Sequence, residues 1–364
     1  MAAFSLGSGI VVSGNGERPE LKDTTEDSTE DFRTGGCYVT LGLMESSVSV
    51  VVPTYNQAKL LIETVDSILA QSLAPAEIVI LDDGSSDDTA EVVRRLPSKV
   101  KYFYKPNGGI CAARNAGAAF VGSKYIAFCD HDDLWRKDKL AKQMDLHHQA
   151  PHMEYSFTNF AIVSDGVWAS ASKFEDAPAD FFDGCRSLST SGLICEDSLY
   201  EKLLRFQPIW PSTILITKRL FQKLDGFNEA FGRNPSEDLE FTLRCLQQGP
   251  VGIITEPVVG VRKHSTNFSR SNYRNTLGQI EILLYALEHH DISESIRAAV
   301  LNQVALRRVD ASYSAFELKQ FDVCRDLLSK VPRSYITHKV RAKQIISSLP
   351  SAISNRLHAL LIRH

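Results

Sequence analysis

Four short apolar runs alternate with helix-like segments early in the chain, and this alternation constrains the fold more than any other feature. The runs have the β-branched and aromatic character of buried strands: residues 48–52, 78–81, 101–104 and 125–129. Helical spacing follows each of the first three runs. The first and third helices are expected at residues 60–70 and 112–119. The second is expected to begin near Asp88, with Ser86 or Asp87 as its cap, and to contain Ala90, Val93 and Leu96. This order predicts an α/β fold with a mostly parallel sheet and right-handed crossovers.

Polar residues follow three of these predicted strands. Pro53 and Tyr55 come after the first, Asp83 after the second, and residues 130–133 after the fourth. Because ligands bind beyond the carboxyl ends of such strands, we expect one crevice here. These groups suit a nucleotide: the Tyr55 ring could stack on the base, Asp83 could accept a hydrogen bond from a base N–H, and a metal could bind the diphosphate. Neither GxGxxG nor GxxxxGK[ST] occurs, which argues against a dinucleotide dehydrogenase and a P-loop NTPase.

Three carboxylates crowd the end of the fourth strand, at Asp130, Asp132 and Asp133. Like charges at this spacing raise each other's pKa, so a bound cation would offset the repulsion. Oxygen ligands indicate Mg²⁺ or Mn²⁺. The alternative is a solvated acidic turn that caps the next helix.

Each candidate also has a plain structural alternative. Tyr55 could pack on the following helix, Asp82 and Asp83 could form a turn and cap, and Arg114 could be a solvated helix residue. Gly108 and Gly109 are interpreted as backbone-permissive residues near the crevice, with no chemistry assigned.

Four segments together resemble the successive motifs of family 2 glycosyltransferases with the GT-A fold: residues 50–56 (VVVPTYN), 80–89 (ILDDGSSDDT), 107–117 (NGGICAARNAG) and 128–135 (FCDHDDLW). The resemblance covers about residues 47–270. It implies a Rossmann-like GT-A sheet and an inverting transferase that uses a nucleotide-diphosphate sugar and a divalent metal. It also implies that the Pro53 backbone, Tyr55 and Asp83 hold the base, that Arg114 lies near the nucleotide, and that Asp130 and Asp132 meet ribose and metal, with Asp133 assisting.

The second half adds candidates for the acceptor side. Residues 236–246 (SEDLEFTLRCL) predict a helix with Ser236 as N-cap and a buried stripe of Leu239, Leu243 and Leu246. Acids at a helix start need no further purpose, since they stabilise the helix dipole. The family resemblance, however, implies that Asp238 is the catalytic base and that Glu237 positions the acceptor.

His264 lies in a basic segment after a strand at 258–261, and this segment resembles a family element. His264 could be a metal or diphosphate ligand; the alternative is a surface histidine.

Strand-like spacing is found at 155–163, and the rest of residues 151–205 is predicted to be loop or lid. A helix is expected at 218–224. No Gln-x-x-Arg-Trp element is found, so we expect addition of one or a few sugars without processive polymerisation.

The ends of the chain differ from its middle. Residues 1–46 are rich in Gly, Ser, Thr and acids and are expected to be disordered, or to precede a natural start at Met44. Residues 271–364 predict a helical appendage, with Ile280, Leu283, Leu284 and Leu287 on one face, followed by two further sets. These sets are Ala311, Ala315 and Leu318, then Phe321, Cys324 and Leu328. From Val331 onward the chain has six Lys and Arg residues and no acid, so residues 353–362 are a candidate for peripheral membrane contact.

Composition narrows the partners. A net charge of -4 gives no general attraction to nucleic acid, and no apolar run is long enough for a membrane span. The seven cysteines show neither zinc spacing nor a disulfide framework, which favours a location in the reducing cytoplasm. The inner face of the membrane is a second expected location, through the basic C-terminus.

The sequence-based hypothesis is a cytoplasmic, metal-dependent, inverting glycosyltransferase with domains at 47–270 (donor half 47–145, acceptor half 146–270) and 271–364. We expect a UDP-sugar donor and a glycan, lipid-linked or protein-linked acceptor, in surface polysaccharide or glycoconjugate assembly. Two rivals remain: a metal-dependent nucleotidyltransferase, which should carry a Gly-rich phosphate loop, and a non-enzymatic domain with a structural cation site.

Overall fold

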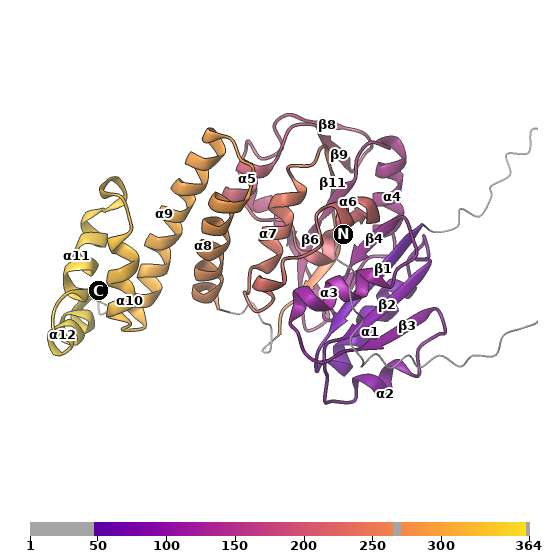
Figure 1. Ribbon diagram of the computed structural model, residues 1–364, viewed down its shortest axis with the longest axis horizontal. Coiled ribbons are helices and arrows are strands. Elements are labelled where there is room, and N and C mark those ends of the chain that lie inside the picture. Colours follow the sequence, from indigo (N-terminus) through magenta and orange to yellow (C-terminus); the bar gives the residue numbers. More distant parts are fainter. Residues whose placement is uncertain (1–46, 265–270, 362–364) are drawn as a thin grey trace, which may run out of the picture.

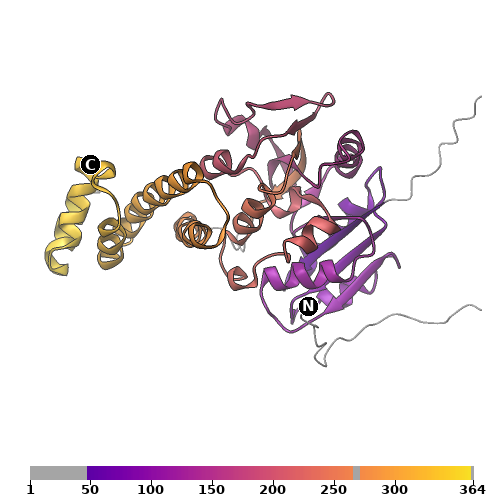
Figure 2. The same cartoon turned by 45° about the horizontal axis from the view of Figure 1, so that its top comes forward.

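The computed structural model describes residues 47–264 and 271–361 of the 364-residue chain. The expectations for residues 1–46, for the segment after His264 and for the last three residues lie outside the described part. Figures 1 and 2 show an α/β body from which a series of helices extends to one side.

The first half of the body is the parallel sheet that the sequence predicts. Four parallel strands pair in the order β3-β2-β1-β4. Their bounds are β1 (Val48–Thr54), β2 (Glu77–Asp82), β3 (Val100–Tyr104) and β4 (Tyr125–Phe128). The connecting helices are α1 (Ala58–Leu69), α2 (Thr89–Val93) and α3 (Ile110–Ala119). Strands β1, β2 and β4 are buried along their whole length, which explains their apolar sequences.

Helix α2 is shorter than the sequence predicts, because it ends at Val93, short of Leu96. Asp87 supports its start by accepting hydrogen bonds from the backbone N–H and the hydroxyl of Thr89, at 3.1 and 2.5 Å.

The second half extends the same sheet with mixed strand directions. β10 (Leu215–Thr217) runs antiparallel between β4 and β6 (Tyr155–Ser164), and β11 (Val251–Arg262) runs parallel to β6. The described sheet has 11 strands, completed by β5 (Leu134–Trp135), β7 (Val167–Ser172), β8 (Cys185–Ser187) and β9 (Gly192–Cys195). Its helices are α4 (Lys139–Gln149), α5 (Tyr200–Arg205), α6 (Lys218–Lys223) and α7 (Glu237–Cys245), with 3-10 turns η1 (Lys173–Asp176), η2 (Pro211–Thr213) and η3 (Glu229–Phe231). The mixed α/β fold with a central, mostly parallel sheet flanked by helices is confirmed.

The prediction that much of residues 151–205 is loop or lid was wrong. This region holds β7, η1, β8, β9 and α5. Asp165 and Gly166 both have positive φ, at 51° and 77°, so they form the tight turn between β6 and β7. β7 is mostly exposed, and it therefore lacks the apolar alternation that marks a half-buried strand.

One cysteine pair bears on the expectation that the cysteines show no disulfide framework. Cys185 and Cys195 are joined by a disulfide across the antiparallel β8–β9 pair, where they lie directly opposite each other. The register of the two strands brings these cysteines together, and their separation of ten residues in the sequence does not by itself predict a disulfide. The inference of a reducing compartment loses this part of its support.

The helical C-terminal region begins at α8 (Asn272–His289) and continues through α9 (Glu294–Glu317), α10 (Phe321–Ser329), η4 (Arg333–Tyr335), α11 (His338–Ser347) and α12 (Ser351–Leu361). One buried cluster continues from the sheet through α7 into α8, α9 and α10. Leu284 and Leu318 are exposed, in contrast to the buried faces expected for them. Among the described helices, none is long and apolar enough to cross a membrane.

Candidate active site

A cavity of about 1260 Å³ opens at the carboxyl ends of β1, β2 and β4 and reaches the start of α7 and the end of β11. All nine predicted site residues line it: Pro53, Tyr55, Asp83, Arg114, Asp130, Asp132, Glu237, Asp238 and His264. Residues up to 211 positions apart in the sequence therefore meet in one place, because the strand order brings their ends to the same edge of the sheet.

The end of the cavity next to β2 is organised by Asp83. Its carboxylate accepts hydrogen bonds from the backbone N–H groups of Gly108 and Gly109, at 2.9 and 2.8 Å, and pairs with the Lys105 ammonium at 2.6 Å. Gly109 has φ +92°, and an added Cβ would lie 2.9 Å from the Gly232 oxygen, so both its conformation and its surroundings favour glycine. Asp83 thus holds the loop that leads into α3.

Tyr55 and Pro53 lie at the end of β1. Tyr55 is 47% exposed and lines the cavity, so its side chain is accessible to a ligand there. The Pro53 carbonyl oxygen lies 3.2 Å from His131 Nδ1, which joins the end of β1 to the loop after β4.

The three carboxylates after β4 occupy different environments. Asp133 is buried and accepts hydrogen bonds from the Ser212 hydroxyl and, at 3.1 Å, from the Arg262 N–H. Burial and the charges of Asp132 and Asp130 raise the pKa of Asp133 well above its ordinary value. Asp130 and Asp132 remain partly exposed at the cavity wall, so Asp133 anchors the loop while these two face the cavity.

His264 joins this wall from the end of β11. Its Nε2 lies 2.8 Å from Asp132 Oδ2, and both side chains are less than one-fifth exposed. The contact brings His264 to the carboxylates with which the sequence grouped it, and the alternative of an isolated surface histidine does not hold.

Arg114 links the Asp cluster to the start of α7. Its guanidinium is 2.8 Å from Asp130 Oδ1 and 2.7 Å from Glu237 Oε1, and it lies 5.1 Å above the Phe227 ring centroid. The residue is 2% exposed, so the alternative of a solvated helix residue is wrong. Burial acts to lower the pKa of Arg114, but the two carboxylates outweigh it and raise the pKa.

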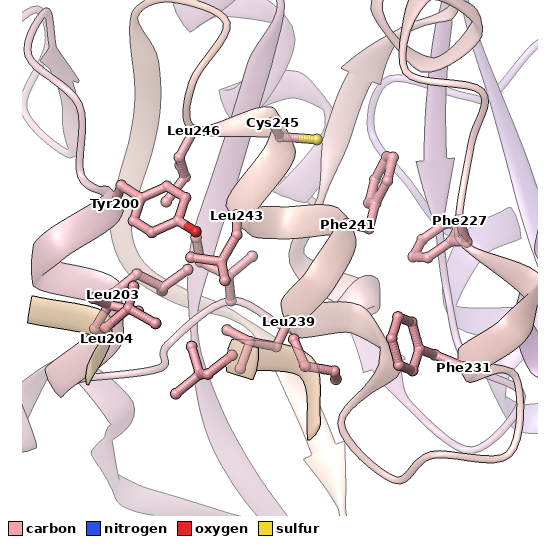
Figure 3. Close-up of a cluster of buried hydrophobic side chains, with 14 of the residues drawn as sticks. Tyr200, Leu203, Leu204, Phe227, Phe231, Leu239, Phe241, Leu243, Cys245 and Leu246 are labelled. Carbon is pink, nitrogen blue, oxygen red and sulfur yellow. The ribbon is translucent and has the colours of Figure 1, made fainter. Parts of the chain in front are cut away.

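Helix α7 holds Glu237 and Asp238 at its first turn. Figure 3 shows Phe241 of this helix on the same side as Phe227 and Phe231, and an aliphatic group on the other side. That group includes Leu203, Leu204, Leu239, Leu243 and Leu246. The predicted buried stripe of α7 is confirmed.

Ser236 occupies the N-cap position of α7, but its side chain does not cap the helix. Its hydroxyl instead donates to the Asn275 carbonyl oxygen of α8, at 3.3 Å. The hydroxyl therefore ties this loop to the C-terminal helices.

The two acids of α7 differ in their surroundings. Glu237 is buried and faces Arg114, whereas Asp238 is half-buried and lines the cavity. Burial, followed by the charge of Glu237, raises the pKa of Asp238, and burial likewise raises that of Glu237 against the opposing effect of Arg114. A carboxylate with a raised pKa is a stronger base once it is ionised.

Comparison with known proteins agrees with this geometry. Residues 49–200 match the family model described as glycosyl transferase family 2. Those residues belong to glycosyltransferase family 2.

Two curated relatives illustrate the extent of the likeness. A Rickettsia felis protein named as an uncharacterized glycosyltransferase is 29% identical over 257 residues, which are 69% of this chain but 39% of that protein. TuaG of Bacillus subtilis, whose name refers to teichuronic acid biosynthesis, is 35% identical over 136 residues, 36% of this chain and 53% of TuaG. The chain thus spans about two-fifths of the first relative and half of the second.

Solved structures show the same fold beyond the family 2 match. S. aureus TarS 1–349 in complex with UDP-GlcNAc aligns with a TM-score of 0.58 at 19% identity, over 86% of this chain and 91% of that one. The mannosyltransferase PcManGT of Pyrobaculum calidifontis, in complex with GDP-Man and Mn²⁺, gives a TM-score of 0.50 at 18% identity, over 87% and 88% of the two chains. At these identities the likeness establishes the GT-A fold.

The side chains at this cavity fit a divalent cation that binds together with a phosphorylated ligand. Asp130 and Asp132 offer the carboxylate oxygens that Mg²⁺ and Mn²⁺ prefer. Within residues 47–264 and 271–361, however, no three His, Cys, Asp or Glu side chains are arranged to enclose a metal ion. Magnesium commonly binds one or two carboxylates plus substrate phosphates, so this donor set suits a shared site.

Several residues at or next to this cavity were missed in the sequence. Ser212 connects the Asp130 backbone, whose N–H it accepts at 3.0 Å, to the Asp133 carboxylate. Phe227 lies under Arg114, and Gln279 and Arg307 bring the C-terminal helices to the cavity. A serine after Trp-Pro and a phenylalanine after Asp-Gly are common in loops, and no local pattern distinguishes them.

Proposed function

We propose that the chain is a metal-dependent, inverting glycosyltransferase that moves a sugar from a nucleotide-diphosphate donor, a UDP-sugar, to a hydroxyl of a glycan, lipid-linked or protein-linked acceptor. One observation carries the proposal. Arg114 joins the Asp130 wall to Glu237, next to Asp238, within one cavity. The UDP-GlcNAc and GDP-Man complexes of TarS and PcManGT support a nucleotide-sugar donor.

In this mechanism Tyr55 stacks on the base at the end of β1, while Pro53 and Asp83 contact its edge. Asp130 and Asp132 would hold the divalent cation jointly with the diphosphate, and His264, 2.8 Å from Asp132, would contact the cation or the diphosphate. The cation would supply charge neutralisation for the diphosphate. Arg114 keeps Asp130 and Glu237 in fixed positions.

Asp238 performs the proton transfer. Its carboxylate takes the proton of the acceptor hydroxyl as that oxygen attacks the anomeric carbon, and Glu237 helps to position the acceptor. The bond from the anomeric carbon to the diphosphate oxygen breaks, and its electron pair leaves with the nucleoside diphosphate. One displacement on the opposite face inverts the anomeric configuration.

The pathway is proposed to be the assembly of a cell-surface polysaccharide or glycoconjugate, in keeping with the name of TuaG. The cytoplasm and the inner face of its membrane are the proposed location. Beyond Val331 the basic side chains of Arg333, Lys339, Arg341 and Arg356 are exposed, and the chain from Val331 onward contains no Asp or Glu. Such a surface suits an anionic membrane that carries a lipid-linked acceptor.

Calorimetry with UDP tests the proposed function. We expect UDP to bind in Mn²⁺ and to lose most of its affinity in EDTA, and Mn²⁺ alone to bind weakly because the cation shares its ligands with the diphosphate. The Asp132→Ala variant should lose the metal-dependent part of UDP binding. Tight Mn²⁺ binding without affinity for UDP would instead support a structural cation site and refute the proposal.

A further inference from the structure

The far end of the cavity is built by the C-terminal helices. Leu203 and Gln207, at and after α5, line it together with Gln279 of α8 and Arg307 of α9. The volume of about 1260 Å³ exceeds the 300 to 1,000 Å³ that is usual for one small ligand. Helices α8 and α9 therefore form a wall of a space large enough for a second substrate.

Arg307 is a cation with neutral partners at this end. Its guanidinium donates to Gln279 Oε1 at 2.9 Å, to Gln303 Oε1 at 2.6 Å and to the Leu204 carbonyl oxygen at 2.9 Å. Among the described residues, no carboxylate lies within ion-pair distance of it. Burial lowers the pKa of Arg307 to about 10, with Asp310 opposing, so the group stays charged at neutral pH.

A plain structural role for Arg307 is to satisfy the last carbonyls of α5, where Leu204 lies. That role uses one of its five N–H groups, and the two glutamine oxygens take two more. Two of its five N–H groups are therefore left without a partner among the described residues, and Arg307 lines the cavity.

A second cation, Arg233, lines the same cavity five residues before Asp238. Its backbone is fixed on both sides, since Gly232 O accepts the Ile110 N–H at 3.3 Å and the Asn234 amide donates to Gly278 O at 3.2 Å. Its side chain is exposed, and within the described residues it forms neither an ion pair nor a hydrogen bond. A held backbone with an unpaired guanidinium is suited to binding a ligand.

The α8 helix connects the two cations through the catalytic loop. Ser236 contacts Asn275, and Gln279, the partner of Arg307, follows four residues later, about 6 Å along the helix axis. Two acids that line the cavity are engaged: Asp176 pairs with Lys173 at 3.3 Å, and Glu175 accepts the Ser172 N–H at 2.7 Å. Asp310, whose charge acts on Arg307, is exposed.

We propose that this end of the cavity binds an oxyanion of the acceptor, a phosphate or a carboxylate, through Arg307 and Arg233. The acceptor is then an anionic glycan or polyol phosphate whose hydroxyl reaches Asp238. This inference rests on the proposed function, because that function places the acceptor beside α7. Hydrogen bonds to a charged partner are stronger than neutral ones, which explains why arginine is used there.

Nuclear magnetic resonance of the full chain, labelled with ¹⁵N-arginine and saturated with UDP and Mg²⁺, tests the proposal. The Arg307 Nε–H signal is assigned by its loss in Arg307→Lys. Glycerol 1-phosphate or glucuronate should shift it saturably, whereas the neutral matches glycerol and glucose should not. The more effective anion identifies the source as phosphate or carboxylate.

The exposed Arg233 provides a variant that should leave the fold intact. Arg233→Gln should weaken the effective anion about tenfold, the loss of one hydrogen bond to a charged group. No shift with either anion, or equal shifts with the neutral compounds, overturns the proposal. UDP affinity is measured first in the same sample, and its absence would show that the proposed function is wrong. If UDP binds but the Arg307 Nε–H signal does not shift with either anion, only the proposed anion site is wrong.

Discussion

Removing the Arg114 guanidinium tests whether this buried cation holds the two halves of the site together. In Arg114→Met the side chain keeps much of its volume, but Glu237 and Asp130 lose partners at 2.7 and 2.8 Å. Glu237 is 9% exposed at its side chain, so its charge is left without solvent or counterion. Removing one partner of a buried ion pair costs about 3 to 5 kcal/mol, and we expect the unfolding free energy to fall by that amount at pH 8.

The pH dependence separates lost charge compensation from lost packing. Burial already raises the pKa of Glu237, and Arg114 opposes that rise. Without Arg114 the pKa rises further, so Glu237 takes up a proton as the pH falls. The deficit of Arg114→Met relative to the natural chain should therefore be largest at pH 8 and smaller at pH 5.

Urea unfolding of the full chain, followed by circular dichroism, measures this deficit. The matched control is Arg95→Met, which removes an exposed i,i+4 partner of Glu91 and should cost no more than about 0.5 kcal/mol. In the double variant Arg114→Met/Glu237→Gln the unpaired charge is gone, so part of the loss should be recovered. A deficit below about 1 kcal/mol, or one equal at both pH values, would refute the role of Arg114 as a buried counterion.

Three further predictions concern catalysis and location. Asp238→Asn should abolish sugar transfer, measured with radiolabelled donor, while UDP affinity by calorimetry stays unchanged; normal transfer would exclude Asp238 as the base. Because the pKa of Asp238 is raised and the base must be ionised, kcat should increase as the pH rises from 5 to 8, and a flat profile would contradict that role. The full chain should sediment with vesicles containing phosphatidylglycerol and not with pure phosphatidylcholine, and the exposed pair Lys339→Glu/Arg341→Glu should reduce this binding; equal binding to both vesicles would exclude an electrostatic contact.

Much of the fold was predictable because its signals are local. The buried strands β1, β2 and β4 have continuous apolar sequences, and the turns after them carry the polar residues of the site. β7 and β8 could not be predicted in this way, since they are largely exposed and depend on their neighbours for pairing.

The sequence by itself determined the nine candidate residues, through motif order and through the rule that parallel strands end at one edge of a sheet. Only the tertiary structure decided the surroundings of these residues and of the neighbouring Asp133. Asp133 anchors its loop, Arg114 is a buried link between carboxylates, and Asp238 is a half-buried carboxylate at the cavity. It also brought Arg307, from a helix far along the chain, to the same cavity. The physical reason is that burial and ion pairing depend on contacts between distant segments, whereas residue type and spacing along the chain specify only which groups are available.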